Sequence, residues 1–259
     1  MTRILLALAI FALPARAADC AACTASKLCA PHVESDKEAC KALQTGLANA
    51  DPAVRKSAID MFAEACSAHL NCRPASNAAL LGAALKDTDP AVRIRAAGQL
   101  GLTQDPRTTV KLLNPFIDPL GKRLDKEPKP GKDEVAWDHD FDFMKAIIVA
   151  LAATGVPEAG PPMVRILGCA RLIVTEAAAQ ECHRVRSREV PPAILERFDE
   201  VKKTPPETYR DRAYMALVAA WEKLTTSGVP PPAANSAGEA NRWLSDCKAW
   251  WKANEKKFK

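Results

Sequence analysis

The chain has 259 residues, of which 48% are hydrophobic and 26% are charged, a balance that is ordinary for a globular protein and excludes bulk disorder. The formal net charge of +5 is too small to indicate a nucleic-acid-binding protein or a protein held to an anionic membrane. Aromatic residues make up only 5%, while Ala and Leu are frequent, and this bias favours helices over strands.

The first residues are typical of a secretory signal peptide. Arg3 supplies a positive charge, residues 4–13 are all apolar, and Ala15-Arg16-Ala17 matches a small-x-small cleavage site. An apolar run of this length is too short to span a hydrocarbon core of about 30 Å. We therefore expect residues 1–17 to be removed, the mature chain not to insert into a membrane, and the protein to be periplasmic or extracellular.

Nine cysteines follow the expected cleavage site, and in an exported protein disulfides are the first expectation for them. Two candidate pairs are close in sequence, Cys66 with Cys72 and Cys169 with Cys182. Cys247 is left over, either as a buried thiol or as a partner in an intermolecular bond. The pairing of the remaining candidates stays open among Cys20, Cys23, Cys29 and Cys40.

The early cysteines also resemble the ligands of two kinds of cofactor site. A zinc site formed by Cys20, Cys23 and Cys29 with His32 or Cys40 is an alternative to disulfides, because thiolates and imidazole suit zinc. A c-type haem site is excluded, since Thr24 stands where the histidine would be needed. We expect no metal and no cofactor.

The sequence Asp-Pro-Ala-Val-Arg occurs twice, beginning at Asp51 and again 38 residues later at Asp89. The two aspartates are expected to accept hydrogen bonds from free N–H groups at a helix start, which is worth about 1 kcal/mol for each cap. Pro52 and Pro90 then occupy the first helical position, where a missing N–H costs nothing. The motif therefore predicts the start of a helix in each copy.

The rest of the motif predicts how neighbouring helices meet. Val54 and Val92 are expected to point inward. Arg55 and Arg93 recur at the same phase and are expected to form a ladder along one edge, where each could meet an aspartate of the next unit. Apolar residues at helical spacing support a helix on either side of each turn, namely Leu43 with Leu47, Leu81 with Leu85, and Val92 with Ala96 and Leu100.

A unit of helix, Asp-Pro-x-Val-Arg turn and helix, carried by residues 40–102, resembles the HEAT repeat of the armadillo-like α-solenoid class. Together with the N-terminal pattern, the chain is similar to exported bacterial-type HEAT-repeat proteins. The resemblance implies an all-α, right-handed α-α superhelix of about four helix pairs closed by a C-terminal helix. It also implies a non-enzymatic scaffold that binds another protein through its concave face or its long loops.

The later units are less regular. A helix from Asp105 contains Pro115 and Pro119, which are expected to bend or divide it. Residues 125–140 are expected to be a charged loop, and a partner helix capped by Asp138 or Asp140 then runs to Gly155. A fourth pair is expected from residues 161–182 and 207–228, with a long connection between them.

These elements give a domain plan. A Cys-rich segment at 18–39 precedes the repeat array at 40–228, a Pro-rich linker at 229–238 follows it, and a C-terminal helix occupies 239–259. In residues 207–228, Ala213, Leu217 and Trp221 share one helical face. Trp243, Cys247 and Trp250 share a face of the last helix, which is expected to cap the open end of the array.

No catalytic residues are predicted, because no motif in the chain combines a nucleophile with a base. A second candidate metal site, besides the early cysteines, combines Asp138, His139, Asp140 and Asp142. Acids also gather at helix N-termini because the helix dipole favours negative charge there, and the spacing does not match a Ca²⁺ loop.

The leading hypothesis is an interaction scaffold whose contact points are the second long loop and the aromatics near Trp137. The alternative is a metal-binding or enzymatic HEAT-like protein using Asp138–Asp142 or the N-terminal cysteines.

Overall fold

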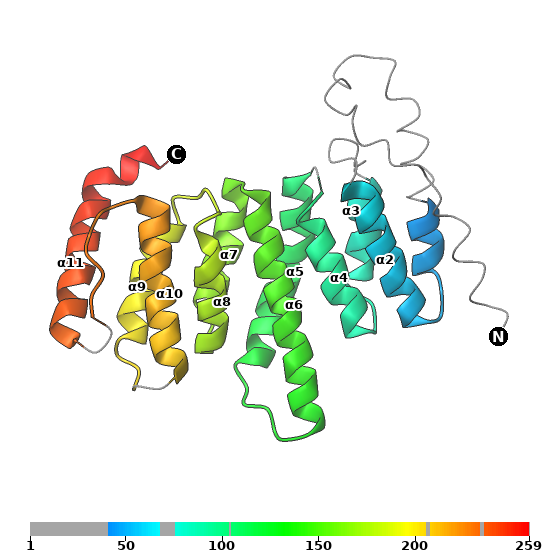
Figure 1. Ribbon diagram of the computed structural model, residues 1–259, viewed down its shortest axis with the longest axis horizontal. Helices are drawn as coiled ribbons and strands as arrows, with labels where there is room; N and C mark the ends of the chain where they lie inside the picture. Colours follow the sequence, from blue (N-terminus) through cyan, green and yellow to red (C-terminus); the bar gives the residue numbers. More distant parts are fainter. Residues whose placement is uncertain (1–40, 68–75, 104, 206–207, 234–235, 259) are drawn as a thin grey trace, which may run out of the picture.

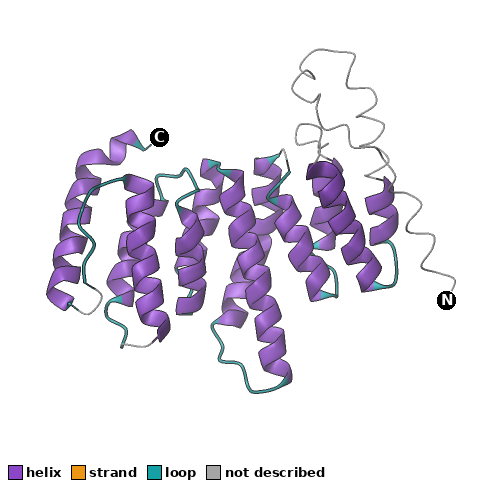
Figure 2. Ribbon diagram, viewed as in Figure 1, coloured by secondary structure: helices purple, strands orange, loops and turns teal. Residues whose placement is uncertain are grey.

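A computed structural model describes residues 41–67, 76–103, 105–205, 208–233 and 236–258. All regular secondary structure in these ranges is helical (Figure 2), which confirms the all-α prediction. Residues 41–47 are helical. The elements that follow are α2 (Pro52–Ser67), α3 (Ser76–Ala84), α4 (Pro90–Leu100), α5 (Pro106–Leu124), α6 (Lys132–Thr154), the 3-10 turn η2 (Pro157–Ala159), α7 (Gly160–Leu167), α8 (Leu172–Cys182), α9 (Val190–Val201), α10 (Thr208–Thr225), α11 (Ala237–Asn254) and η3 (Glu255–Lys257).

The helices form antiparallel pairs that stack side by side in two rows (Figure 1). One row runs α3, α5, α7, α9 and α11, and the other runs α2, α4, α6, α8 and α10; each helix contacts the next one in its own row. Within a pair, α3 packs on α4, α5 on α6, α7 on α8 and α9 on α10. This sequential packing is the architecture expected from the repeat.

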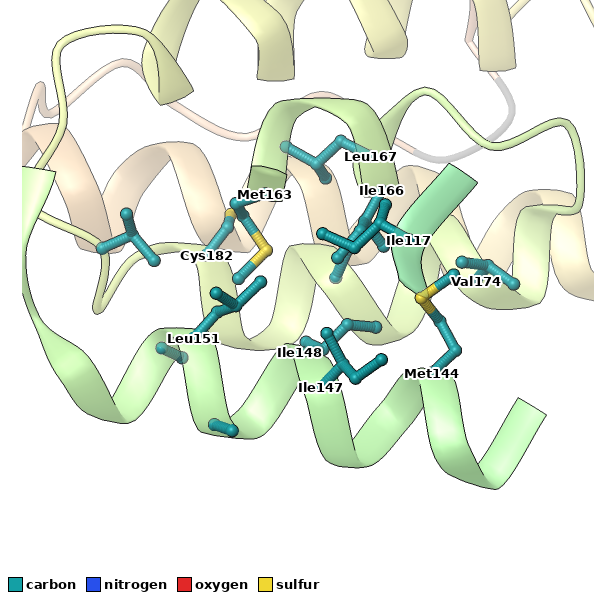
Figure 3. Packing of buried hydrophobic residues seen from close by; sticks show 14 of the residues in the cluster. Ile117, Met144, Ile147, Ile148, Leu151, Met163, Ile166, Leu167, Val174 and Cys182 are labelled. Atoms are coloured by element: carbon teal, nitrogen blue, oxygen red, sulfur yellow. The ribbon is translucent and has the colours of Figure 1, made fainter. Parts of the chain in front are cut away.

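A hydrophobic core fills the space between the two rows and continues along the stack from Leu43 to Cys247. At its centre, side chains of α5, α6, α7 and α8 point toward one another (Figure 3). Those labelled there are almost completely buried: Ile117, Met144, Ile147, Ile148, Leu151, Met163, Ile166, Leu167, Val174 and Cys182. Because each helix row supplies one wall of the core, no single pair could bury its apolar face alone.

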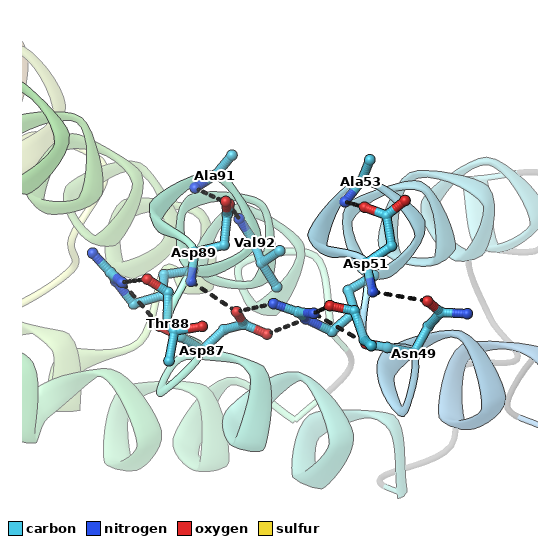
Figure 4. Close-up of polar contacts among 11 residues, drawn as sticks. Asn49, Asp51, Ala53, Asp87, Thr88, Asp89, Ala91 and Val92 are labelled. Carbon is cyan, nitrogen blue, oxygen red and sulfur yellow. Dashed lines mark hydrogen bonds and ion pairs between the residues drawn. The ribbon is translucent and has the colours of Figure 1, made fainter.

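The repeated aspartates start helices, as predicted (Figure 4). Asp51 Oδ1 accepts the N–H of Ala53 at 2.9 Å, and Asp89 Oδ1 accepts those of Ala91 at 2.9 Å and Val92 at 3.2 Å. Pro52 and Pro90 are the first residues of α2 and α4.

The arginines of the motif hold the turn that precedes them. Arg55 Nη1 donates to the carbonyls of Asn49 at 3.0 Å and Ala50 at 2.8 Å. Arg93 Nη1 donates to the carbonyls of the equivalent residues, Asp87 at 2.9 Å and Thr88 at 3.1 Å. Both copies of the motif thus build the same hydrogen-bonded turn.

Arg55 also crosses to the next pair, which confirms the predicted ladder for the first copy. Its Nε and Nη2 atoms donate to the two carboxylate oxygens of Asp87, each at 2.7 Å (Figure 4). Such a bidentate pair is stronger and more directional than a single ion pair. Arg93 pairs with no aspartate side chain in this way among the described residues; its guanidinium lies 5.8 Å from the centre of the Phe143 ring on α6.

The prediction that both valines of the motif point inward is wrong for Val54. Val92 is fully buried, but Val54 is 40% exposed. Helix α4 lies between α2 and α6 in its row, whereas in the described part of that row α2 contacts α4 alone. Among the described helices, α2 thus has one neighbour in its row where α4 has two, in keeping with the greater exposure of Val54.

Two helices in the middle of the chain also differ from the predictions. Helix α6 begins at Lys132 instead of following a loop that ends at Asp140, and Asp133 and Glu134 occupy its first turn. Helix α5 is continuous through Pro115 and Pro119. Both prolines lie on its exposed side, where water can hydrate the carbonyls that lose their helical partner.

The second half of the array contains one pair more than predicted. Residues 161–182 are not one helical part, because the chain breaks at Gly168 between α7 and α8. The expected long connection holds α9, whose Pro191 lies in the first turn, where proline is tolerated. Counting the helical residues 41–47 with α2, the described residues form five pairs instead of about four.

The final helix closes the stack as predicted. It packs on α9 and buries Trp243 and Cys247, while Trp250 is half-buried. The Trp243 ring lies 4.5 Å from that of Phe198 and 6.4 Å from that of Trp221, measured between centroids. Ala213, Leu217 and Trp221 are buried on one face of α10, also as predicted.

Candidate functional site

The turns inside the helix pairs lie along one edge of the array, the lower edge in Figure 1, which we call the intra-pair edge. It includes residues 48–51, 85–89, 125–131, 168–171 and 202–205. The first two turns carry the Asp-Pro motif. From the third pair onward the motif is absent and the turns change in length and composition. Departures from a repeat consensus often mark a binding surface.

Helix α6 extends past its neighbours at this edge (Figure 1). It has 23 residues, compared with 11 in α4. The Trp137 ring stacks on that of Phe141 at 5.5 Å between centroids, and its Nε1 atom donates to the Leu124 carbonyl at 3.1 Å. Because this N–H is already used inside the protein, the exposed part of Trp137 presents an apolar ring.

Beside the start of α6 lies a groove of about 510 Å³, which we call the edge groove. Three consecutive pairs contribute to it through the α5–α6 turn, the α7–α8 turn with the start of α8, and the α9–α10 region. It is lined by Glu127, Pro128, Trp137, Ala170, Arg171, Leu172, Ile173, Arg197, Thr204 and Tyr209.

The two arginines of the groove have different roles. Each nitrogen of the Arg197 guanidinium is engaged: Arg197 donates to the Cys169 carbonyl, to Thr175 Oγ1 at 3.0 and 3.1 Å, and to Glu200 Oε2 at 2.6 Å. It thereby fixes the α7–α8 turn against α9. Arg171 donates from Nε to the Leu124 carbonyl at 3.2 Å, but its two terminal nitrogens have no acceptor among the described residues. The Arg171 guanidinium is therefore fixed through its Nε atom, and its two terminal nitrogens make no hydrogen bond to the described residues.

The other wall of the groove is Tyr209, which is 45% exposed. The Arg212 guanidinium lies 5.7 Å from the centre of its ring. Arg212 Nη2 is held 2.8 Å from Oε1 of Glu176, a buried carboxylate on α8. The aromatic wall is thus positioned by an ion pair that joins α8 and α10.

A second groove, of about 900 Å³, lies at the opposite edge near the C-terminal residues. Its charged lining balances three cations against three carboxylates: Arg186, Arg188, Lys256, Glu158, Glu189 and Glu255. The helix starts that reach it include Pro161 and Pro192, which lack the N–H groups that bind anions. Its lining therefore selects no particular charge in a ligand.

The predicted acidic cluster does not gather into a metal site. Asp140 accepts both Nε and Nη2 of Arg123, at 2.6 and 2.9 Å, and joins α6 to α5. Asp142 lies 3.9 Å from Lys145 Nζ. Since α6 starts at Lys132, residues 138–142 are spread around one helix. Within the described ranges, no three His, Cys, Asp or Glu side chains come together in a way that could hold a metal ion.

The predicted Cys169–Cys182 disulfide is wrong, because both residues are free buried thiols. Cys169 lies in the turn before α8 and Cys182 is the last residue of that 11-residue helix, which spans roughly 16 Å, whereas disulfides need Cα atoms within about 7 Å. Cys247 is also a buried thiol. Burial raises the pKa of Cys169 to about 11 and those of Cys182 and Cys247 to about 12. The other disulfide candidates lie outside the residues and side chains that the structure describes: Cys20, Cys23, Cys29, Cys40, Cys66 and Cys72. The residues of the zinc alternative also lie outside them.

Two rows of helices, stacked pair upon pair around a continuous core, define this protein as an α-solenoid. Within the α-solenoids, the Asp-Pro turns and the Arg55–Asp87 pair between neighbouring helix pairs are features of a particular repeat type. Residues 40–130 match the family model of HEAT repeats, and this part of the chain belongs to the HEAT-repeat family. HEAT repeats are typically protein-interaction scaffolds and are usually non-enzymatic. No curated protein matches the chain.

Residues 40–130, which match the HEAT-repeat model, include only Glu127 and Pro128 of the residues given above as lining the edge groove. Trp137 had been singled out from the sequence as a contact point, and it lines the groove. Arg171 and Tyr209 were missed, because each is brought to Trp137 only by the stacking of the following pairs. The signal that could have found them is the loss of the Asp-Pro pattern after the second turn.

Proposed function

We propose that the protein is a non-enzymatic scaffold for protein–protein interaction, exported to the periplasm or the outside of the cell, and that the edge groove contacts its partner. The observation that carries this proposal is that two aromatic residues from different helix pairs, Trp137 and Tyr209, line the same groove as the apolar residues Leu172 and Ile173. Aromatic side chains placed around an apolar centre are typical of the residues that dominate protein interfaces.

The helix framework supports a rigid binding surface. The turns around the groove are tied to one another by Arg197, by Arg171 and by Asp125 Oδ1, which accepts the N–H of Ala170 at 3.1 Å. A surface that is already ordered loses little conformational entropy when a partner binds. Exported location is supported by the N-terminal sequence pattern, and none of the helices in the described ranges has the length and apolar character of a membrane span.

The test combines affinity capture with a groove variant. The wild-type chain, the double variant Trp137→Ala/Tyr209→Ala and the control Met215→Ala are purified and exposed to the same envelope extract. Met215 is 45% exposed on α10 and lies outside the groove lining. A partner that binds saturably to wild type and control, but not to the double variant, supports the proposal. Absence of any saturable partner, or equal binding by all three proteins, would refute it.

Export has its own measurement. Fractionation of cells that produce the full chain, followed by N-terminal sequencing, should find the protein outside the cytoplasm with Ala18 as its first residue. Recovery of a cytoplasmic chain that begins at Met1 would contradict the proposed location and leave the binding proposal to be judged on its own result.

A further inference from the structure

We propose that the edge groove binds an extended segment of a partner protein that carries an aspartate or glutamate beside an aliphatic or aromatic residue. This inference rests on the proposed scaffold function and names the chemistry of the partner.

The apolar part of the ligand follows from the walls and the floor of the groove. The Trp137 indole N–H is occupied by the Leu124 carbonyl, so the ring offers surface for packing and no free donor. Leu172 and Ile173 are half-buried and line the groove together with Trp137 and Tyr209. An aliphatic or aromatic side chain would cover this surface and remove it from water, at about 25 cal/mol for each Å² of apolar area.

The acidic part follows from the charges. The described residues of the groove lining include two arginines and one carboxylate, that of Glu127. Arg197 already bonds to Cys169, Thr175 and Glu200, whereas the terminal nitrogens of Arg171 have no acceptor in the described part of the chain. Two parallel N–H donors of a guanidinium match the two oxygens of a carboxylate. A basic segment would instead place a like charge against Arg171.

The size of the groove is consistent with a short segment. Its volume of about 510 Å³ lies within the range of roughly 300–1,000 Å³ that is usual for sites of small ligands, so it holds a few side chains and not a folded domain. The groove is also built from three successive turns of the intra-pair edge. An extended chain laid along that edge would cross all three turns.

The test selects ligands without assuming a known partner. Random dodecapeptides displayed on phage are selected against the full chain, and the enriched sequences are synthesised as fluorescent probes. We expect enrichment of Asp or Glu next to Leu, Ile, Phe or Trp. Replacement of the acid in the probe by its amide should weaken binding to the wild-type protein by about tenfold or more, a result that requires no protein variant.

Protein variants then place the binding at Arg171. Arg171→Glu should bind the acidic probe about tenfold or more weakly and gain affinity for a probe in which Lys replaces the acid. Arg171→Met removes the charge without adding a carboxylate and should bind the acid and amide probes with equal affinity. Arg188→Glu, with the same charge change on an exposed residue of the opposite edge, should bind as wild type.

Several results would overturn the inference. These are no enrichment, enrichment of basic peptides, equal binding of the acid and amide probes, or equal binding of the acidic probe by Arg171→Glu and wild type. The proposed function would survive these results if the captured partner still required Trp137 and Tyr209. It would fail separately if the envelope partner were indifferent to the double variant.

Discussion

Removal of the Trp243 side chain should undock the terminal helix and leave the far end of the stack intact. Trp243 is 3% exposed. A buried Trp removes about 150–250 Å² from water, which at about 25 cal/mol/Å² gives roughly 4–6 kcal/mol. Because part of that area is apolar surface that Ala retains, we expect Trp243→Ala to cost about 3–5 kcal/mol, the usual range for Trp truncation in a core.

This cost should fall on one end of the molecule. Each helix pair contacts only its neighbours, so stability in such arrays is approximately a sum of local terms. Native-state hydrogen exchange read by mass spectrometry should show loss of protection in α11 first, a smaller loss in α9 and α10, and unchanged protection in α2 to α5. Lys248→Ala, on the exposed side of α11, is the matched control and should leave every segment unchanged. An equal loss of protection along the whole chain, or none in α11, would refute the stack of semi-independent pairs.

Three further predictions concern the turns, the thiols and the close approach of two helices. The guanidinium of Arg55 lowers the pKa of Asp87, so the pair stabilises the fold above the unfolded-state value of about pH 4 and the stabilisation is lost as the pH falls through the lower folded value. Urea melts across pH should therefore show Asp87→Asn less stable than wild type near neutrality, with the gap closing in acid; a gap independent of pH would contradict the ion pair. At a pH of ~8 the native protein should resist iodoacetamide at three cysteines whose pKa values are raised by burial, and label there only when unfolded: Cys169, Cys182 and Cys247. Rapid native labelling, or a linked Cys169–Cys182 peptide in non-reducing mass spectrometry, would overturn this. Gly101→Ala would place a Cβ 2.6 Å from Ala150 Cα and should destabilise by about 1–3 kcal/mol, whereas Gly98→Ala, with open space around its Cβ, should stabilise by up to about 1 kcal/mol; denaturant melts in the reverse order would contradict the α4–α6 contact.

The regular half of the fold was predictable because its signals are local. An aspartate that caps a helix, a proline in its first position and an arginine that holds the preceding turn all act within a few residues of Asp51 or Asp89. The phase of Ala213, Leu217 and Trp221 needed only the period of one helix. Such features can be read without knowing which helices are neighbours.

The predictions were wrong where the outcome depends on which helices form and which of them become neighbours. Val54 and Val92 occupy the same place in the motif, yet among the described helices α4, which carries Val92, has a neighbour on both sides in its row, whereas α2 has one. Pro191 was interpreted as part of a connection, although proline is equally suited to the first turn of a helix. The Cys169–Cys182 pair looked close in sequence, but a helix between two residues separates them more than a loop would.

The candidate site was predictable only in part. Trp137 stood out as an aromatic residue in a charged, proline-containing segment. Arg171 and Tyr209 lie in sequence that carries no motif, and their meeting with Trp137 depends on the stacking of the third, fourth and fifth pairs. Local pattern can show that the repeat changes at this point, but not which surface the change creates.

Partner contact at the edge groove is most directly measured by photo-crosslinking in cells. A photoreactive phenylalanine replaces Thr204, which lines the edge groove, or Arg186, which lines the groove at the opposite edge. We expect a discrete crosslinked partner from position 204 and none from position 186, and the crosslink should be lost in the Trp137→Ala/Tyr209→Ala background. A partner crosslinked from position 186 alone, or equally from both positions, would contradict binding at the edge groove.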